Sequence, residues 1–248
     1  IEMGVASLTR FVGDVPAVDI FYLPFVFNTE ELVRKAVAPG SPVRAPLDAA
    51  ILETGSRVLW WQAYGGAILL SKGAPVKTPA DMKNKKVRVF GKTLGAFTEA
   101  AGGSPTLISG SEQYLAYQRG TVDIGMTGVS GVKSRKLWEV MDHITVTNHA
   151  DIEFIVLVNE KFWQGLDEGT RKIISDAALK AEMAVRDEMT KIEEGAYAAA
   201  KENGMTVYTP TAEEIAEWRK TAQPVIDGYK AASGELGQKV LDAAMAMQ

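Results

Sequence analysis

Few residues of this chain could bind or transform a small molecule, and Arg88 is the most informative of them. Along Lys86–Phe90, strand alternation would direct Val87 and Val89 to one face and Arg88 to the other. Arg88 would also lie near the C-terminal end of a parallel strand, where open α/β sheets bind ligands. A charge buried between a sheet and its helices is costly unless it is paired. We therefore expect Arg88 to pair with an anion, either a bound ligand or an acidic side chain such as Asp123.

Two glycine-containing segments follow predicted strands, as phosphate-binding loops do. The first, residues 91–93 (GKT), lacks the earlier glycine of a P-loop because position 86 is a lysine. The second, residues 125–131 (GMTGVSG), has the wrong glycine spacing for a dinucleotide fingerprint. It also lacks the residue between Ser130 and Gly131 that a nucleophile elbow needs. We expect residues 125–131 to form a flexible loop that contacts a ligand.

The remaining reactive groups do not assemble into a catalytic or metal site. His143 and His149 are the only histidines, and neither has the spacing of a metal motif, so each is expected to be structural or at the surface. Acidic pairs such as Glu30-Glu31 are typical of solvated helix faces. The absence of cysteine excludes disulfides, thiolate zinc sites and cysteine nucleophiles. The sequence therefore predicts neither an enzyme nor a bound cofactor.

Composition sets the broad class of the protein. A length of 248 residues allows one large α/β domain or two lobes, and 46% hydrophobic with 23% charged residues is ordinary globular usage. The net charge of -4 and the lack of a basic run argue against a nucleic-acid partner. No apolar stretch approaches the roughly 18 residues that span a bilayer. Because Ile1 is not an initiator, we expect the chain to have been processed or trimmed.

The elements that would position Arg88 alternate between strands and helices. Strands are predicted at residues 86–90, 105–108 and 121–125, with helices at 94–101 and 113–119 between them. Glycines stand where both helices should end. Two successive strand-helix-strand units of this length predict a parallel sheet.

Two long helices are predicted in the second half of the chain. Residues 168–203 contain no proline and keep helical spacing until Gly204, so this helix would run about 50 Å and lie across two lobes as a strut. A second helix is expected to start near Thr211 and to be interrupted at Pro224. Further strands are expected at residues 56–62, 67–70 and 153–158, the first two separated by Gly65-Gly66.

Several segments, in order along the chain, resemble the solute-binding proteins of TRAP transporters, the DctP family. Residues 78–89 (TPADMKNKKVRV) match the family's TP-x-D-(L/M)-K-x-x-K-(I/V)-R-V pattern. Residues 103–106 (GSPT) match its GASPTP, and residues 111–123 (SEQYLAYQRGTVD) match E-x-Y-x-A-L-Q-x-G-x-VDG. Similar but shorter matches lie at residues 19–27, 136–140, 147–149 and 158–163. The resemblance thus covers nearly the whole chain.

The resemblance implies an α/β fold of the two-lobed periplasmic binding protein type, with mainly parallel sheets, a hinge and a long helix that spans both lobes. The first lobe would hold residues 1–65 and 153–192, and the second residues 66–152 and 193–248. The hinge would lie near Tyr64-Gly65-Gly66 and Asp151-Ile152-Glu153. The protein would be exported to the periplasm with its signal peptide removed and would act as a monomer.

The implied function is capture of a small organic acid between the lobes and its delivery to the small and large permease subunits in the membrane. By resemblance, Arg88 would bind the ligand carboxylate. The other expected ligand-binding residues are Phe90, Thr127, Ser7, Tyr64 and His149. Trp60 and Trp61 could also line the site, although a core role for at least two of these aromatic residues is expected. A ligand-binding sensor of the same fold, or an enzyme on the same lobes, remains an alternative.

The chain departs from the family pattern in three places. The match starts only at the last strand of the family's opening strand-helix-strand unit, which we expect to exist in the natural protein. Thr127 and Gly128 stand where the sialic-acid and ectoine binders often have an asparagine. Ala67 and Ile68 stand where many members have a second arginine, so a second positive group is expected to be missing and a monocarboxylate to be preferred.

Overall fold

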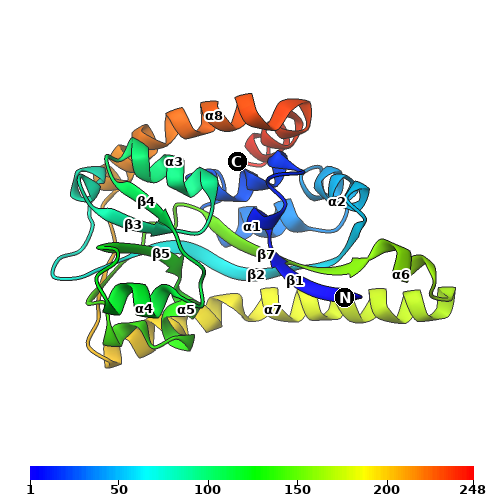
Figure 1. Cartoon of the computed structure of the whole chain (residues 1–248), viewed down its shortest axis with the longest axis horizontal. Coiled ribbons are helices and arrows are strands. Elements are labelled where there is room, and N and C mark those ends of the chain that lie inside the picture. The colour runs from blue at the N-terminus through cyan, green and yellow to red at the C-terminus, as the bar shows by residue number, and fades with distance from the viewer.

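Strand β2 (Ser56–Ser71) is the axis of the structure, a computed structural model that describes residues 1–248 (Figure 1). Up to Gly66, which lies opposite Asp151, it pairs antiparallel with β7 (Asp151–Asn159). From Ala67, opposite Gly128, it pairs antiparallel with β5 (Ile124–Gly128). The sequence predicted two strands here. Gly65, at φ +99°, instead follows an irregularity in the register, so the strand bends without ending.

The other strands extend this sheet on both sides in the order β1-β7-β2-β5-β3-β4. The strands β3, β4 and β5 are parallel, as their alternation with helices predicted. In contrast, β7 runs antiparallel to both of its neighbours, β1 and β2. The remaining bounds are β1 (Met3–Ser7), β3 (Lys86–Val89), β4 (Ser104–Leu107), β6 (His143–Thr145) and β8 (Thr206–Tyr208).

Short helices connect the strands and cover the sheet. The α-helices are α1 (Glu30–Val37), α2 (Arg44–Glu53), α3 (Lys92–Ala100), α4 (Gln113–Gln118), α5 (Val129–Ser134) and α6 (Glu160–Gln164). Short 3₁₀ helices lie at Leu8–Arg10, Pro16–Tyr22, Pro79–Met82 and Leu137–Glu139. The expectation of a flexible loop at residues 125–131 is wrong, because β5 runs directly into α5 and both elements are largely buried.

Helix α7 (Glu168–Glu202) matches its predicted bounds closely. The side chain of Asp167 caps its start by accepting a hydrogen bond from the Thr170 N–H at 2.9 Å. The helix has 35 residues, so it is about 52 Å long. It runs along one side of the molecule and packs on β2 and α5 (Figure 1).

Helix α8 (Ala212–Met245) runs along the opposite side, over α3 (Figure 1). The predicted interruption at Pro224 is wrong: the helix continues through this proline, and the break lies at Gly234. At φ 60° and ψ -156°, Gly234 has a conformation that residues with a side chain adopt only at a cost. Trp218 donates to the Lys77 carbonyl at 2.9 Å and Tyr229 to the Ala17 carbonyl at 2.9 Å, so α8 joins segments far apart in the chain. The lobe boundaries remain a prediction.

A buried cluster of charged side chains fastens α7 to the sheet. Both terminal nitrogens of Arg186 donate to the carboxylate of Glu153 on β7, each at 2.8 Å. One turn earlier on α7, Glu182 accepts from Arg44 at 2.6 Å and from the backbone N–H of Trp61 at 3.2 Å. Arg186, Glu153, Glu182 and Arg44 are all buried. Breaking such a pair leaves an uncompensated charge, which is strongly destabilising.

Asp151 is the acid in this region without a matching cation. It lies at the start of β7, is buried, and its Oδ1 has no hydrogen-bond partner. Burial, with the negative charge of Glu153 beside it, raises the pKa of Asp151 well above its usual range, although Arg186 acts in the opposite direction. As the pH rises above 3.8, the ordinary pKa of an aspartate, the carboxyl group of Asp151 loses its proton in the unfolded state while the folded state still holds it. The contribution of Asp151 to folding stability therefore falls as the pH rises through this range.

We predict that Asp151→Asn stabilises the protein at pH 7 by about 1–3 kcal/mol, because it removes a buried acid that lacks a full set of partners. The gain should vanish toward about pH 3, below the unfolded-state pKa of 3.8, where the folded and unfolded states both hold the proton. Urea unfolding between about pH 3 and pH 7 measures the difference, with the exposed Asp14→Asn as the matched control. Equal pH slopes for wild type and Asp151→Asn would contradict the prediction.

Candidate functional site

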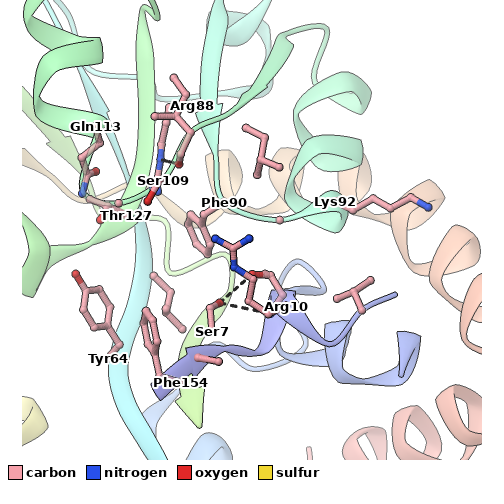
Figure 2. A pocket seen from close by; sticks show the side chains of 18 of the residues that line it. Ser7, Arg10, Tyr64, Arg88, Phe90, Lys92, Ser109, Gln113, Thr127 and Phe154 are labelled. Atoms are coloured by element: carbon pink, nitrogen blue, oxygen red, sulfur yellow. Dashed lines mark hydrogen bonds between the residues drawn. The ribbon is translucent and has the colours of Figure 1, made fainter. Parts of the chain in front are cut away.

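A cavity of about 690 Å³ opens where the two parts of the sheet meet. Its walls come from β1 and the 3₁₀ helix at Leu8–Arg10 on one side and from the carboxyl ends of β3, β4 and β5 on the other. Figure 2 shows this arrangement, with Arg88, Gln113 and Thr127 facing Ser7 and Arg10. The carboxyl edge of a parallel sheet is where such folds usually bind ligands.

Most of the residues expected from the sequence line this cavity. They are Ser7, Tyr64, Arg88, Phe90 and Thr127. They come from four strands and from the turn after β3, so residues 120 positions apart in the chain lie around one space (Figure 2). Whether each of them touches a ligand stays a prediction.

His149 is the exception, since it does not line the cavity. It is fully buried, its ring stacks on Phe97 at 5.6 Å, and its Nδ1 lies 2.7 Å from the Thr147 hydroxyl. Burial lowers the pKa of His149 to about 3, so the ring is neutral at physiological pH. The structure thus gives His149 a packing role in the core. This placement differs from the expectation that His149 faces the ligand.

The two tryptophans also lie outside the cavity lining. Trp61 is fully buried and donates from Nε1 to Asp48 at 2.8 Å, and Trp60 donates to Gln62 at 3.2 Å. The aromatic wall consists instead of Tyr64, Phe90 and Phe154. Of the four candidate aromatic residues, Trp61 alone is buried in the core and Trp60 is only half-buried, so the expected core role for at least two of them is not met.

Arg88 is held rigidly at the cavity wall by backbone carbonyls. Its Nε donates to the Ile108 carbonyl at 3.0 Å and its Nη1 donates to the Met126 carbonyl. The guanidinium carbon also lies 5.2 Å from the centre of the Phe90 ring. These contacts fix the plane of the guanidinium group, while its Nη2 makes no hydrogen bond in the structure.

No carboxylate of the protein pairs with Arg88, although only 4% of the residue is exposed. Asp123, the alternative partner, is exposed just before β5. Its side chain accepts a hydrogen bond from the Lys86 N–H at 2.8 Å and does not reach Arg88. Burial lowers the pKa of Arg88, and the nearby Arg135 acts in the same direction. A buried cation without a counterion is expensive, so this arrangement favours binding of an anion.

The cavity lining has a large excess of positive charge. Arg10, Lys92 and Arg135 line it together with Arg88, and the lining contains no aspartate or glutamate. The expectation of a single positive group is therefore wrong, and with it the basis for a monocarboxylate preference. The extra cations come from the 3₁₀ helix after β1, the start of α3 and the end of α5. Only the tertiary fold brings these elements together, so no local sequence signal pointed to Arg10 or Arg135.

Uncharged donors complete the wall. Ser7, Thr9, Ser109, Gln113 and Thr127 line the cavity. The carbonyl oxygen of Gln113 accepts from the Tyr117 hydroxyl at 3.2 Å, which leaves its amide N–H groups to donate elsewhere. The site can therefore bind an anion with charged groups and hydrogen-bond its neutral remainder. No cluster of histidine, cysteine and acidic residues suited to holding a metal ion occurs in the structure.

Comparison with known proteins agrees with this geometry. The DctP family model, described as bacterial extracellular solute-binding protein family 7, matches residues 1–232. The C4-dicarboxylate-binding periplasmic protein DctP of Rhodobacter capsulatus is 30% identical over 231 residues, which are 92% of this chain and 68% of that protein. The ectoine-binding periplasmic protein TeaA of Halomonas elongata is 26% identical over 237 residues, 94% of this chain and 69% of that protein.

Solved structures show the same fold. The ectoine-binding protein of the Halomonas elongata TeaABC TRAP transporter superimposes with a TM-score of 0.92 at 24% identity, over 100% of this chain and 82% of that one. A TRAP periplasmic solute binding protein from Sulfurospirillum deleyianum, with bound succinate, superimposes with a TM-score of 0.91 at 25% identity, over 100% and 80% of the two chains.

Proposed function

Because this chain belongs to bacterial extracellular solute-binding protein family 7, we propose that it captures a small organic acid in the cavity and delivers it to the membrane subunits of a TRAP transporter. The observation that carries the proposal is the lining itself: four cationic side chains, no acidic one, and a buried arginine without a counterion. A ligand carboxylate would supply the missing charge and bind the planar guanidinium of Arg88 through two hydrogen bonds.

The relatives narrow the class of ligand. The relative from Rhodobacter capsulatus is named for C4-dicarboxylates, and the structure from Sulfurospirillum deleyianum holds succinate. We infer that a carboxylate is the feature that this chain recognises. A thermal-shift screen of mono-, di- and hydroxycarboxylates tests the proposal directly, because a ligand that binds only the folded state raises the melting temperature.

We propose that the protein works in the periplasm as a monomer, after removal of a signal peptide, with the small and large TRAP permease subunits as partners. The named relatives are periplasmic proteins. None of the helices in the structure combines the length and the apolar character needed to cross a membrane. The family consists of solute-binding proteins, and the cavity of this chain provides a place where such a solute could bind.

We further propose that residues 1–65 with 153–192 and residues 66–152 with 193–248 form two lobes that close on the ligand. The support is the change of partner along β2, which passes from β7 to β5 between Gly66 and Ala67. The cavity lies beside this crossing, because Tyr64 and Ile152 both line it. A rotation at the crossing would change the distance between its two walls.

We predict that Arg88→Ala lowers the affinity for the best acid of the screen at least thirtyfold. Truncating one partner of a desolvated charge pair costs about 2–5 kcal/mol, and roughly 2 kcal/mol corresponds to that factor. Arg88→Lys should recover only part of the affinity, since lysine lacks the planar fork. Calorimetry on folded variants measures this.

The control for this prediction is Arg119→Ala, which removes the same charge from an exposed position at the end of α4. It should bind as the wild type does. Near wild-type affinity in a folded Arg88→Ala variant would assign Arg88 to the structure alone.

We predict that X-ray scattering gives a smaller radius of gyration for the ligand-saturated protein than for the ligand-free protein, because the two lobes approach each other around the bound acid. Arg88→Ala at the same acid concentration should keep the ligand-free radius. An unchanged radius in a sample with confirmed binding would rule out closure.

A further inference from the structure

Arg135 stands close to Arg88 at the cavity wall. A methyl group built on Gly110 would lie 3.4 Å from Nη2 of Arg135 and 4.0 Å from Nη2 of Arg88. The two side chains come from different elements, Arg88 from β3 and Arg135 from the end of α5. Two guanidinium groups that approach one point repel each other unless an anion lies between them.

Neither guanidinium has a carboxylate partner in the protein. The ion pairs of the structure involve Arg34, Arg44, Arg57, Arg186 and three lysines, and not Arg88 or Arg135. Arg135 makes a single side-chain hydrogen bond, from Nη1 to the Tyr64 hydroxyl at 2.9 Å. Nη2 of each arginine therefore keeps its N–H groups free, and both face the same part of the cavity.

Tyr64 holds Arg135 in this position. Glycines at positions 128 and 131 make room for Tyr64, since a Cβ on either would lie within 3.0 Å of a Tyr64 side-chain atom. The Tyr64 carbonyl also accepts a hydrogen bond from Ser130 at 3.3 Å. Tyr64 belongs to β2, two residues before the strand changes its partner, so the position of Arg135 depends on the crossing strand.

We propose that Arg135 is a second carboxylate-binding residue, which shares the ligand carboxylate with Arg88 and is positioned by Tyr64. This proposal rests on the proposed function and adds a specificity-determining residue to it. Arg135 supplies from α5 the second guanidinium that Ala67 and Ile68 do not provide from β2. A carboxylate bridging two fixed guanidinium groups is held in one orientation, which a single arginine would not impose.

A purely structural role for Arg135 makes a different prediction. Arg135 is the C-cap residue of α5, where a positive charge interacts favourably with the helix dipole. A lysine would satisfy that role as well as an arginine does. Replacement by lysine should then leave ligand binding unchanged, and replacement by glutamine should change only stability.

The first experiment uses acetate as the probe, because it presents a carboxylate and little else. Melting temperatures are measured in sodium acetate and in sodium chloride of equal ionic strength for wild type, Arg88→Lys, Arg135→Gln, Arg135→Lys and the exposed control Arg119→Gln. Wild type and the control should gain stability in acetate relative to chloride. We expect Arg135→Gln to lose this gain, and Arg135→Lys and Arg88→Lys each to retain only part of it.

The outcomes separate this proposal from the proposed function. Loss of the gain in Arg88→Lys with full retention in Arg135→Gln would overturn the role of Arg135 and leave the proposed function intact. A wild type that gains nothing from acetate over chloride would count against both. Circular dichroism of each variant confirms that it is folded before the comparison is made.

The second experiment measures the affinity for succinate by calorimetry. Arg135→Gln should bind at least about tenfold more weakly than wild type, the factor for roughly 1.4 kcal/mol. Tyr64→Phe, which keeps the ring but removes the hydrogen bond to Arg135, should lose roughly threefold to tenfold. In the double variant of Arg88→Lys with Arg135→Gln, the two losses should not add, because both residues hold one carboxylate. Additive losses, or an affinity of Arg135→Gln within twofold of wild type, would overturn the proposal.

Discussion

The continuity of strand β2 is the constraint on which the rest of the structure depends. Its backbone pairs with β7 along one part and with β5 along the other, so neither part of the sheet can form independently of it. Every backbone N–H and C=O buried in the sheet needs a partner, which fixes the register on both sides of the crossing. The cavity lies beside this crossing, and Tyr64 and Ile152 reach it from the two crossing strands.

The charges of the protein are divided between two kinds of site. Around α7, buried cations and carboxylates meet within the chain, as in the double contact of Arg186 with Glu153 at 2.8 Å. In the cavity the cations have no such partners, although the whole chain carries a net charge of -4. An acidic protein with a positively lined cavity attracts anions to that one place, because the local field outweighs the distant negative surface.

Local patterns in the sequence predicted much of this fold. The spacing of apolar residues predicted β3, β4 and α7, because strand and helix periodicities depend only on residues close in the sequence. The alternation of strands with helices predicted the parallel pairing of β3 with β4 and β5. Local rules misjudged Pro224, which a helix packed on both α3 and the segment at residues 16–22 accommodates. Tertiary contacts along α8 offset the lost hydrogen bond of the proline.

The sequence by itself predicted most of the element types, the family and the unusual place of Arg88, whose charge interrupts an apolar strand. Only the tertiary structure decided which other groups share its cavity. Arg10 and Arg135 are far from Arg88 in the chain and carry no local sign of a common site, while His149 is directed into the core by its stacking on Phe97. The pattern of residues adjacent in the sequence determines on which face of its own helix or strand a side chain lies. The meeting of side chains from different elements depends on how those elements pack, which no segment encodes alone.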